Sequence, residues 1–246
     1  MNTSKDSVQG IKKVVAVTGV SRGIGREIFL QCAAHPELRV FGVSRNQEQL
    51  DQLSSECAEA GCGDFHLFSF DVTSESLSEH LAEHLKSVGQ IDVLIHNAGA
   101  LVNKPFQEIT YEDWLKCYRT NVYGPFRYTQ LLLPWLMKSP QAHIVNIGSM
   151  GGVQGSAKFP GLSAYSSSKA ALIGWGECLA EELKETNIRV NTVNLGSVQT
   201  EMLAEAFPGF EAAHGPGEVA KWLIDFCLNS GALINGKSIQ LSDSTP

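Results

Sequence analysis

The sequence has no long apolar run. No segment reaches the roughly 18 consecutive apolar residues that a membrane-spanning helix needs. The stretch from Met1 to Gln9 is polar and lacks the apolar centre of a signal peptide. We therefore expect a protein that neither spans a membrane nor is secreted, and that works in the cytoplasm.

Positive charge and paired cysteines are also scarce. The chain has 19 Lys and Arg against 26 Asp and Glu, for a net charge of -7. Because a negative net charge disfavours binding to a phosphate backbone, we expect no nucleic-acid partner.

The six cysteines form no C-x-x-C pair and have no metal-ligand spacing; they are Cys32, Cys57, Cys62, Cys117, Cys178 and Cys227. We expect reduced thiols and no metal site.

Length and composition point to one domain. The chain has 246 residues, 43% of them hydrophobic, which is enough to bury a substantial core but short for two domains. No internal repeat or low-complexity tract divides it. We expect a single domain over residues 1–246, which would then carry every functional site of the chain.

Short apolar or β-branched runs alternate with helical stretches. The expected strands are Val14–Thr18, Val40–Ser44, Phe65–Asp71, Val93–Ala98, Ile144–Ser149, Arg189–Asn194 and Ser238–Leu241. The expected helices are Glu27–Ala34, Gln47–Ala60, Ser74–Val88, Tyr111–Lys138, Tyr165–Thr186 and Gly217–Ser230, with capping oxygens from Asp71–Ser74 before the third. The alternation predicts an α/β fold, a doubly wound parallel sheet of about seven strands with helices on both faces.

The first expected strand runs into a glycine-rich turn that opens a helix. Glycine there permits positive φ and close approach of a pyrophosphate, and the helix amino terminus offers unpaired N–H groups. Spaced glycines also occur in purely structural turns, but the preceding valine-rich strand favours a nucleotide site. The residues expected to contact a dinucleotide are Gly19, Ser21, Arg22, Gly23, Ile24 and Gly25.

Two further strand ends are expected to complete this site. The second strand ends at Ser44 and Arg45, where sites for an unphosphorylated ribose usually carry a carboxylate. Because the acid is missing, and Arg45 and Arg22 can pair with a 2′-phosphate, we expect NADP(H) to be preferred and NAD(H) to be possible. The alternative is that both arginines are ordinary solvated side chains. Asn97-Ala98-Gly99 ends the fourth strand at the carboxyl edge of the sheet, where such folds bind ligands, although the tripeptide alone can be a simple turn.

Tyr165 and Lys169 lie one helical turn apart, sixteen and twenty residues beyond Ser149 at the end of a strand. A free phenol has a pKa of about 10, and a nearby ammonium lowers it towards the range useful for proton transfer. A tyrosine and a lysine at this spacing also occur together by chance. In a chain that also holds a nucleotide, the trio favours transfer of a hydride and a proton to a carbonyl.

The order of these motifs along the chain resembles the short-chain dehydrogenase/reductase family, and the likeness covers nearly the whole chain. The matching residues are Thr18-Gly19-x-x-x-Gly23-x-Gly25, Asn97-Ala98-Gly99, Asn121, Ser149 and Tyr165-x-x-x-Lys169. The resemblance implies a Rossmann-like sheet with both the cofactor site and the substrate site in one NAD(P)-binding domain.

The resemblance also implies a role for each matched residue. Tyr165 would be the general acid in carbonyl reduction, Lys169 would lower its pKa and hold the nicotinamide ribose, and Ser149 would bind the substrate oxygen. Asn121 would hold a water that links the lysine to solvent. The remaining implied cofactor contacts are Asp71, Val72, Gly196, Val198 and Thr200. Plainer roles are a strand-end cap for Ser149, a helix-kink partner for Asn121, a helix cap for Asp71 and a loop hydroxyl for Thr200.

The chain departs from the family pattern in four places. Asn194-Leu195-Gly196 replaces the usual Asn-Pro-Gly, and the segment between Ser149 and Tyr165 is a few residues longer than is common. The expected substrate lid, Glu201–Gly217, is short, which implies an open site. The end, Ile239–Pro246, lacks an Asp-Gly-Gly-like sequence, which puts tetramer-type packing of the tail in doubt.

The predicted function is an NADP(H)-dependent oxidoreductase that interconverts a carbonyl compound and its alcohol. A 3-oxoacyl-carrier-protein reductase is the alternative, weakened by the few basic residues expected near the entrance, and a non-catalytic nucleotide-sensing protein is the second. Many small or apolar residues on the helix that begins at Tyr165 favour a second subunit packed against it, and deep burial of that helix within the chain is the alternative. We expect a homodimer or homotetramer through residues 111–138 and 165–186.

Overall fold

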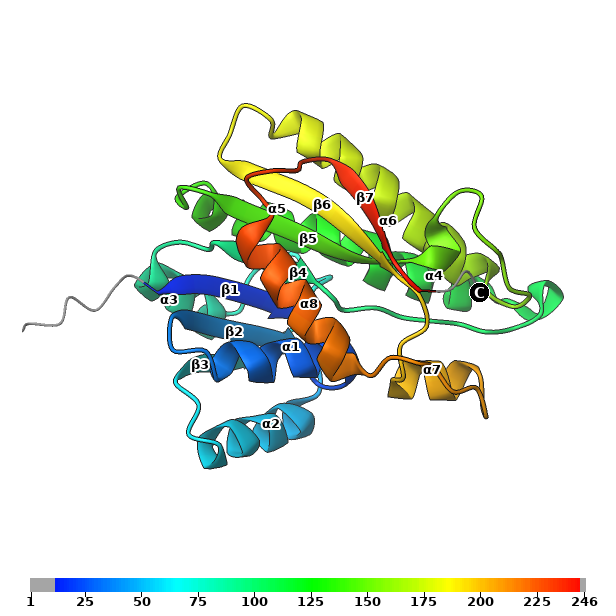
Figure 1. Cartoon of the computed structure of the whole chain (residues 1–246), viewed down its shortest axis with the longest axis horizontal. Coiled ribbons are helices and arrows are strands. Elements are labelled where there is room, and N and C mark those ends of the chain that lie inside the picture. Colours follow the sequence, from blue (N-terminus) through cyan, green and yellow to red (C-terminus); the bar gives the residue numbers. More distant parts are fainter. Residues whose placement is uncertain (1–11, 244–246) are drawn as a thin grey trace, which may run out of the picture.

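The computed structural model describes residues 12–243, which form a layered α/β structure (Figure 1). One sheet has the strand order β3-β2-β1-β4-β5-β6-β7, and all neighbouring strands are parallel. The strands are β1 (Lys13–Thr18), β2 (Leu38–Ser44), β3 (Asp64–Ser69), β4 (Val93–His96), β5 (Ala142–Ser149), β6 (Ile188–Leu195) and β7 (Lys237–Leu241). The predicted doubly wound, Rossmann-like parallel sheet is confirmed.

Helices cover both faces of the sheet. On one face pack α1 (Gly23–Ala33), α2 (Gln47–Glu59) and α8 (Pro216–Asn229), and on the other α3 (Glu79–Val88), α5 (Gly124–Leu136) and α6 (Ser163–Glu182). In Figure 1, α1 and α8 lie side by side in front of the sheet and α6 lies behind it. Two shorter helices, α4 (Tyr111–Tyr118) and α7 (Glu201–Ala206), lie at the carboxyl edge of the strands.

The first strand shows why the apolar runs are continuous. Val15 and Val17 belong to the core beneath α1 and α8, whereas Val14 and Ala16 belong to the core beneath α3, α5 and α6. All four are 3% exposed or less. Alternate side chains of a strand point to opposite faces, so a strand covered on both sides must be apolar at every position.

The topology brings the predicted motifs to one edge. Strand β1 lies between β2 and β4, so the chain leaves β1 on one side of the sheet and returns on the other. The carboxyl ends of neighbouring strands at such a switch point border a crevice. The glycine-rich turn follows β1 there, and Asn97 follows β4.

Several predicted boundaries were wrong. The helix predicted from Ser74 begins at Glu79, where the Ser78 hydroxyl accepts a hydrogen bond from the Leu81 N–H at 3.4 Å. Asp71 caps no helix; its carboxylate accepts from the Thr73 N–H at 2.9 Å and closes a turn after β3. The helix predicted over residues 111–138 is interrupted by a π-helix, Arg119–Tyr123, and α7 was not predicted at all.

Within residues 12–243, no helix is long and apolar enough to cross a membrane. In the same residues, no group of three or more His, Cys, Asp or Glu side chains is placed to hold a metal ion. The six cysteines form no disulfide. The polar stretch at residues 1–9 and the last residues of the carboxyl-terminal tail, 244–246, lie outside the described residues.

Candidate active site

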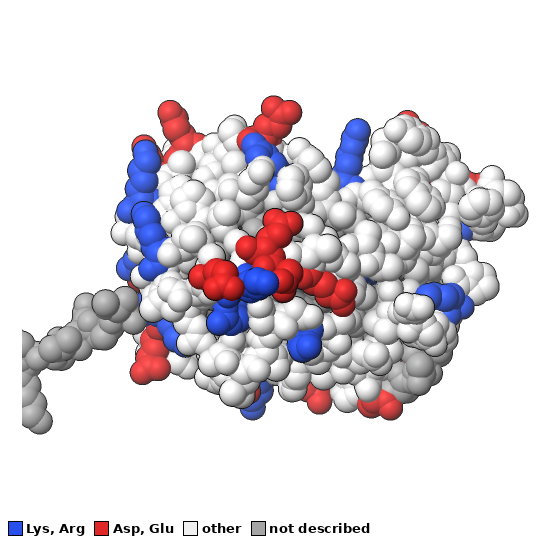
Figure 2. Space-filling view, turned by 90° about the horizontal axis from the view of Figure 1, so that it is seen from above, with Lys and Arg blue, Asp and Glu red and all other residues white. Residues whose placement is uncertain are grey.

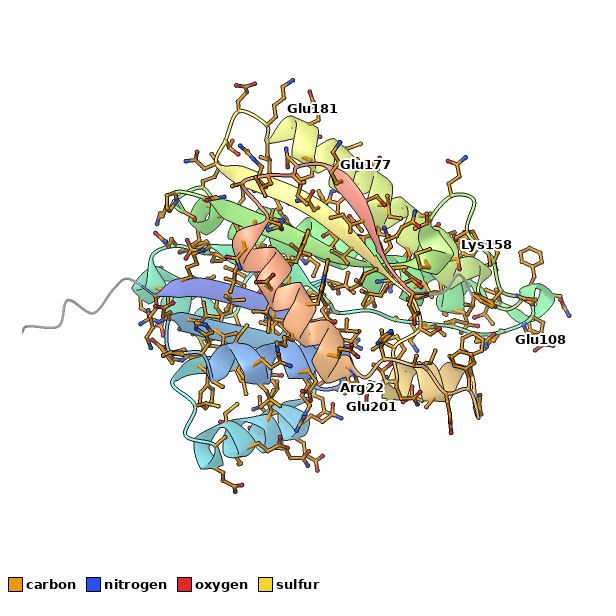
Figure 3. All side chains as sticks on the ribbon, in the orientation of Figure 1. Arg22, Glu108, Lys158, Glu177, Glu181 and Glu201 are labelled. Carbon is orange, nitrogen blue, oxygen red and sulfur yellow. The ribbon has the colours of Figure 1, made fainter. Side chains whose placement is uncertain are left out.

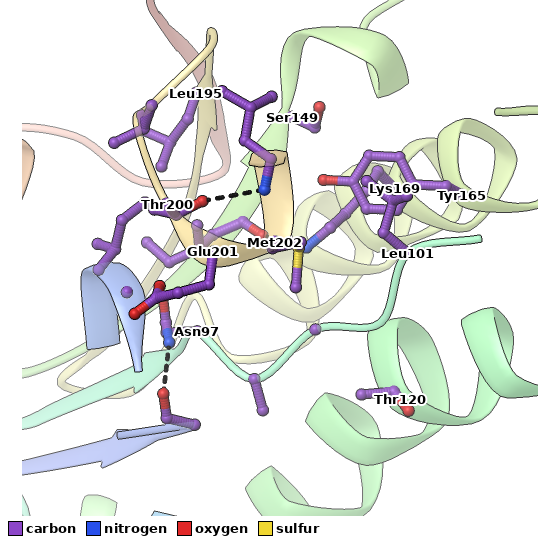
Figure 4. Close-up of a pocket in the computed structure, with 18 of the residues that line it drawn as sticks. Asn97, Leu101, Thr120, Ser149, Tyr165, Lys169, Leu195, Thr200, Glu201 and Met202 are labelled. Carbon is purple, nitrogen blue, oxygen red and sulfur yellow. Dashed lines mark hydrogen bonds between the residues drawn. The ribbon is translucent and has the colours of Figure 1, made fainter. Parts of the chain in front are cut away.

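A cavity of about 1270 Å³ opens at the carboxyl edge of the strands (Figure 4). It brings together nearly every residue predicted from the sequence. The predicted residues that line it are Gly19, Ser21, Arg22, Gly23, Ile24, Ser44, Arg45, Asp71, Val72, Asn97, Ala98, Gly99, Ser149, Tyr165, Lys169, Gly196, Val198 and Thr200. The two predicted residues that do not line the cavity are Gly25 and Asn121, which support it from behind.

The glycine-rich turn is held against the end of β4. At Gly19 φ is +73°, and a Cβ there would come within 2.7 Å of the Ala98 Cα. The Asn97 side-chain amide donates to the carbonyl oxygens of Thr18 and Gly19, at 3.1 and 3.0 Å. A Cβ at Gly25 would collide with that same amide group. Close packing of backbone on backbone therefore requires glycine at both positions.

The amino terminus of α1 faces the cavity without a cap of its own. Arg22, at the N-cap position, makes no side-chain capping bond, and the first turn of α1 has no acidic residue. The N–H groups at this end of the helix are therefore available to an anion, and the helix dipole favours one. Gly23, with φ of +58°, adds no side chain of its own in front of them, and the nearest side chains are those of Thr200 and Glu201.

The two arginines predicted to meet a 2′-phosphate have different surroundings. Arg45 is exposed at the cavity, and its guanidinium has no hydrogen bond or ion pair with any described residue. Arg22 is bound through both terminal nitrogens to the carboxylate of Glu205 on α7, with 3.2 Å between Nη2 and Oε2. No sequence signal marked this contact, because the two residues lie 183 positions apart.

Ser149 and Tyr165 meet in the interior of the cavity. Ser149 ends β5, and Tyr165 lies in the first turn of α6, so that both hydroxyls face the same space (Figure 4). Burial raises the pKa of Tyr165, and its hydrogen bond with Ser149 opposes this rise. The direction is opposite to the lowering expected from the sequence, because the phenol is enclosed and the lysine does not bond to it.

Lys169 lies beneath the tyrosine. Its side chain is 4% exposed; Nζ donates to the Ile147 carbonyl at 2.7 Å and lies 5.9 Å from the centre of the Tyr165 ring. Burial lowers the pKa of Lys169 to about 8, because no carboxylate accompanies the charge. The ammonium is therefore poised to change its charge near neutral pH.

Asn121 connects this lysine helix to the loop after β4. Its amide donates to the Ala100 carbonyl and to the Ser168 hydroxyl, both at 2.9 Å, and its oxygen accepts from the Ala100 N–H at 2.8 Å. The residue is fully buried and lies within the π-helix, whose extra residue per turn changes the direction of its side chain. None of these bonds goes to the backbone of its own helix, so they do not match the plainer role of a helix-kink partner; they join the π-helix to the loop after β4 and to α6.

The outer part of the cavity is largely apolar. Its lining there includes Leu101, Phe159, Leu162, Met202, Leu203, Phe207 and Phe210. The rings of Phe159 and Phe207 meet edge to face with centroids 6.3 Å apart, so the long segment after Ser149 contacts the end of α7. Helix α7 is the first part of the expected lid, and this ring pair joins the lid to that segment.

The geometry described above agrees with a comparison of the sequence with family models. Residues 13–209 match the model described as short chain dehydrogenase. The chain belongs to the short-chain dehydrogenase family. The predicted family is thus confirmed, and the chain is an oxidoreductase of the kind that acts on CH–OH groups or carbonyls with a nicotinamide nucleotide.

Individual relatives show the same similarity. The chain is 34% identical over 207 residues to dehydrogenase/reductase SDR family member 7B of Mus musculus, an alignment that covers 82% of this chain and 62% of that protein. It is 34% identical over 191 residues to a 3-oxoacyl-[acyl-carrier-protein] reductase of Thermotoga maritima, covering 77% of this chain and 76% of the relative. The chain thus spans less than two thirds of the mouse protein and about three quarters of the bacterial one.

A solved structure of a relative carries a nicotinamide nucleotide. A short-chain dehydrogenase from Shigella flexneri 2a, complexed with NADP, superposes with a TM-score of 0.82 at 31% identity, covering 93% of this chain and 96% of that one. The cofactor in the structure of this relative is thus a nicotinamide nucleotide.

Proposed function

We propose that this protein reduces a small or medium-sized carbonyl compound with NADPH, and oxidises the corresponding alcohol in reverse. One observation carries the proposal: Ser149, Tyr165 and Lys169 line the same cavity as the uncapped amino terminus of α1. A dinucleotide with its phosphates at that terminus fits the residues present, because glycines clear its approach. The nicotinamide would supply the hydride.

The protein side of the reaction follows from the positions of three side chains. The Ser149 hydroxyl donates to the substrate oxygen and stabilises the negative charge that develops on it. The Tyr165 Oη–H gives its proton to the same oxygen. The Lys169 ammonium, 5.9 Å from the centre of the ring, would stabilise the tyrosinate left behind.

A panel of neutral ketones and aldehydes, each assayed with NADPH and with NADH, tests the proposal. We expect consumption of reduced cofactor with apolar members of the panel, because the outer cavity is lined with leucine and phenylalanine. Cofactor binding without turnover across the panel would instead support the nucleotide-sensing alternative.

Cofactor preference depends on Arg45 in this proposal. We expect Arg45→Asp to shift the ratio of kcat/KM from NADPH towards NADH, because a carboxylate repels a 2′-phosphate and accepts hydrogen bonds from ribose hydroxyls. Kinetics with both cofactors measure the shift. An equal ratio of kcat/KM for the two cofactors before and after the substitution would show that Arg45 is a solvated side chain with no part in cofactor preference.

Cofactor affinity should depend on pH through Lys169. With a pKa of about 8 the ammonium is charged below that pH and neutral above it. We expect NADPH affinity to be constant at lower pH and to weaken as the pH rises through about 8, because the neutral amine no longer attracts the anionic cofactor. Fluorescence titrations of the native protein and of Lys169→Met measure this; a dependence that persists in the variant would assign it to another group.

The similarity to 3-oxoacyl-[acyl-carrier-protein] reductases favours a second candidate reaction, reduction of a 3-oxoacyl thioester. The cavity lining mixes acidic side chains (Glu112, Glu201 and Glu211) with basic ones (Lys116 and Arg119), so it offers no clearly basic surface to an acidic carrier. We expect a 3-oxoacyl-pantetheine thioester to be reduced no faster than a neutral ketone of similar size. Preference for the thioester on its carrier protein would reverse this order.

We also propose a homodimer or homotetramer through the helices at residues 111–138 and 165–186. Tyr111, Tyr123 and Phe126 in the first of these are 71, 41 and 42% exposed. The face in Figure 2 has broad uncharged areas around a central group of charges. Sedimentation of the purified protein measures the oligomeric state.

We propose the cytoplasm as the location of the protein, because unpaired cysteines are typical of a reducing compartment.

A further inference from the structure

Helix α7 places two carboxylates over the cofactor end of the cavity. Glu201 and Glu205 are one helical turn apart and so lie on the same side of α7. Glu205 holds both terminal nitrogens of Arg22. The Oε2 atom of Glu201 lies 3.6 Å from where a Cβ of Gly23 would be, next to the first residue of α1. Arg22 and Glu201 are labelled together at this place in Figure 3.

These carboxylates face the two surfaces that an anionic cofactor needs. The guanidinium of Arg22 and the amino terminus of α1 both favour negative charge, and a carboxylate satisfies them with the same kind of charge-assisted bond as a phosphate. Arg22 also feels the charge of Glu201, and the pair with Glu205 raises the pKa of Arg22 and lowers that of Glu205. Glu201 lines the cavity itself, whereas Glu205 acts on it through Arg22.

We propose that Glu205 competes with the 2′-phosphate of NADP(H) for Arg22, and that Glu201 competes with the pyrophosphate at the amino terminus of α1. The proposal rests on the proposed function, since it requires that the cavity binds a nicotinamide dinucleotide. Glu205 thereby sets how strongly the protein discriminates between NADPH and NADH, whereas Glu201 weakens the binding of both.

The exposure of the ion pair allows such competition. The side chains of Arg22 and Glu205 are 41% and 63% exposed. An ion pair in contact with water is weak and is screened by salt, so a phosphate with two negative charges can replace the carboxylate. A buried pair would not exchange in this way, because a separated charge would stay uncompensated.

The test compares dissociation constants for NADPH and NADH by fluorescence titration of the full-length protein. We expect Glu205→Gln to tighten NADPH binding about threefold to tenfold and to leave NADH unchanged, because the substitution removes the competing charge and keeps the size. We expect Glu201→Gln to tighten both cofactors by a similar factor. The matched control is Glu59→Gln, which removes one exposed charge from the last residue of α2, outside the cavity lining.

A second comparison, in a variant without Arg22, distinguishes competition between Glu205 and the 2′-phosphate from an indirect effect of the substitution on folding or on α7. In an Arg22→Gln background, Glu205→Gln should no longer change the ratio of the two dissociation constants, because the contested guanidinium is gone. Weaker NADPH binding in Glu205→Gln would overturn the inference, since Glu205 would then position Arg22 for the phosphate. An equal change for both cofactors, or none, would also overturn it.

The outcome also distinguishes this inference from the proposed function. If the native protein binds NADPH and reduces carbonyls but the Glu205→Gln ratio is unchanged, only the competition is wrong. If the native protein binds neither cofactor, both the proposed function and the competition are wrong.

Discussion

Replacing Tyr165 by phenylalanine is expected to reduce turnover about 10²- to 10⁴-fold, the range that a positioned general acid contributes. The substitution removes a single oxygen and leaves the ring in place over Lys169 and against Val102 and Ala164. NADPH affinity and the melting temperature should therefore change little. Steady-state kinetics with the best carbonyl of the panel, together with a cofactor titration, measure the two effects separately.

Ser149→Ala is the natural companion to this experiment. It removes the hydroxyl that faces Tyr165 across the cavity, and with it the hydrogen bond that opposes the rise in the tyrosine pKa. We expect a loss of turnover in the same direction with cofactor affinity retained. Full turnover in Tyr165→Phe would assign the proton to another group, and a parallel loss of cofactor binding would make the tyrosine a structural residue.

The second large effect is expected for Gly25→Ala. The new methyl group would collide with the Asn97 amide and with the Gly19 carbonyl, and neither can move freely because a hydrogen bond joins them at 3.0 Å. Overpacking of this kind costs about 1–3 kcal/mol of the free energy of unfolding. We expect a lower melting temperature and weaker NADPH binding together, because the displaced turn is the one that faces the cofactor.

The chain provides a matched control in Gly174→Ala. Gly174 also lies within a helix, α6, but a Cβ there would meet nothing within 4 Å. Alanine in a helix interior is favoured over glycine by about 0.5–1 kcal/mol, so this variant should be as stable as the native protein or slightly more stable. Equal melting temperatures for the two variants would contradict the close approach of Gly25 and Asn97. Thermal unfolding followed by circular dichroism gives both values.

Residues with a local signal were predictable from the sequence. A strand buried on both faces must be apolar at every position, so β1 appears in the sequence as the continuous run from Val14. The turn after it needs a positive φ at position 19, so it appears in the sequence as a glycine. For this reason the seven strands were located to within two residues at every end. The parallel topology then placed Asn97 next to the glycine-rich turn without further information.

Contacts between distant segments left no such pattern. The pairing of Arg22 with Glu205 depends on the position of α7. The residues of this short helix, Glu201–Ala206, favour a helix after the Thr200 cap, but nothing in them shows that it lies against Arg22. The π-helix at Arg119–Tyr123 is a local irregularity that a helical pattern continues through. The pKa of Tyr165 was predicted in the wrong direction, because a sequence shows the neighbouring lysine and not the enclosure of the phenol.

Transfer of deuterium from labelled cofactor tests the central claim most directly. The native protein would be incubated with its best carbonyl substrate and NADPH that carries deuterium at C4 of the nicotinamide, in each of the two C4 epimers. The account predicts an alcohol with deuterium on the former carbonyl carbon from one epimer and none from the other, because a fixed cavity presents one face of the ring. An alcohol without deuterium from both epimers would contradict it.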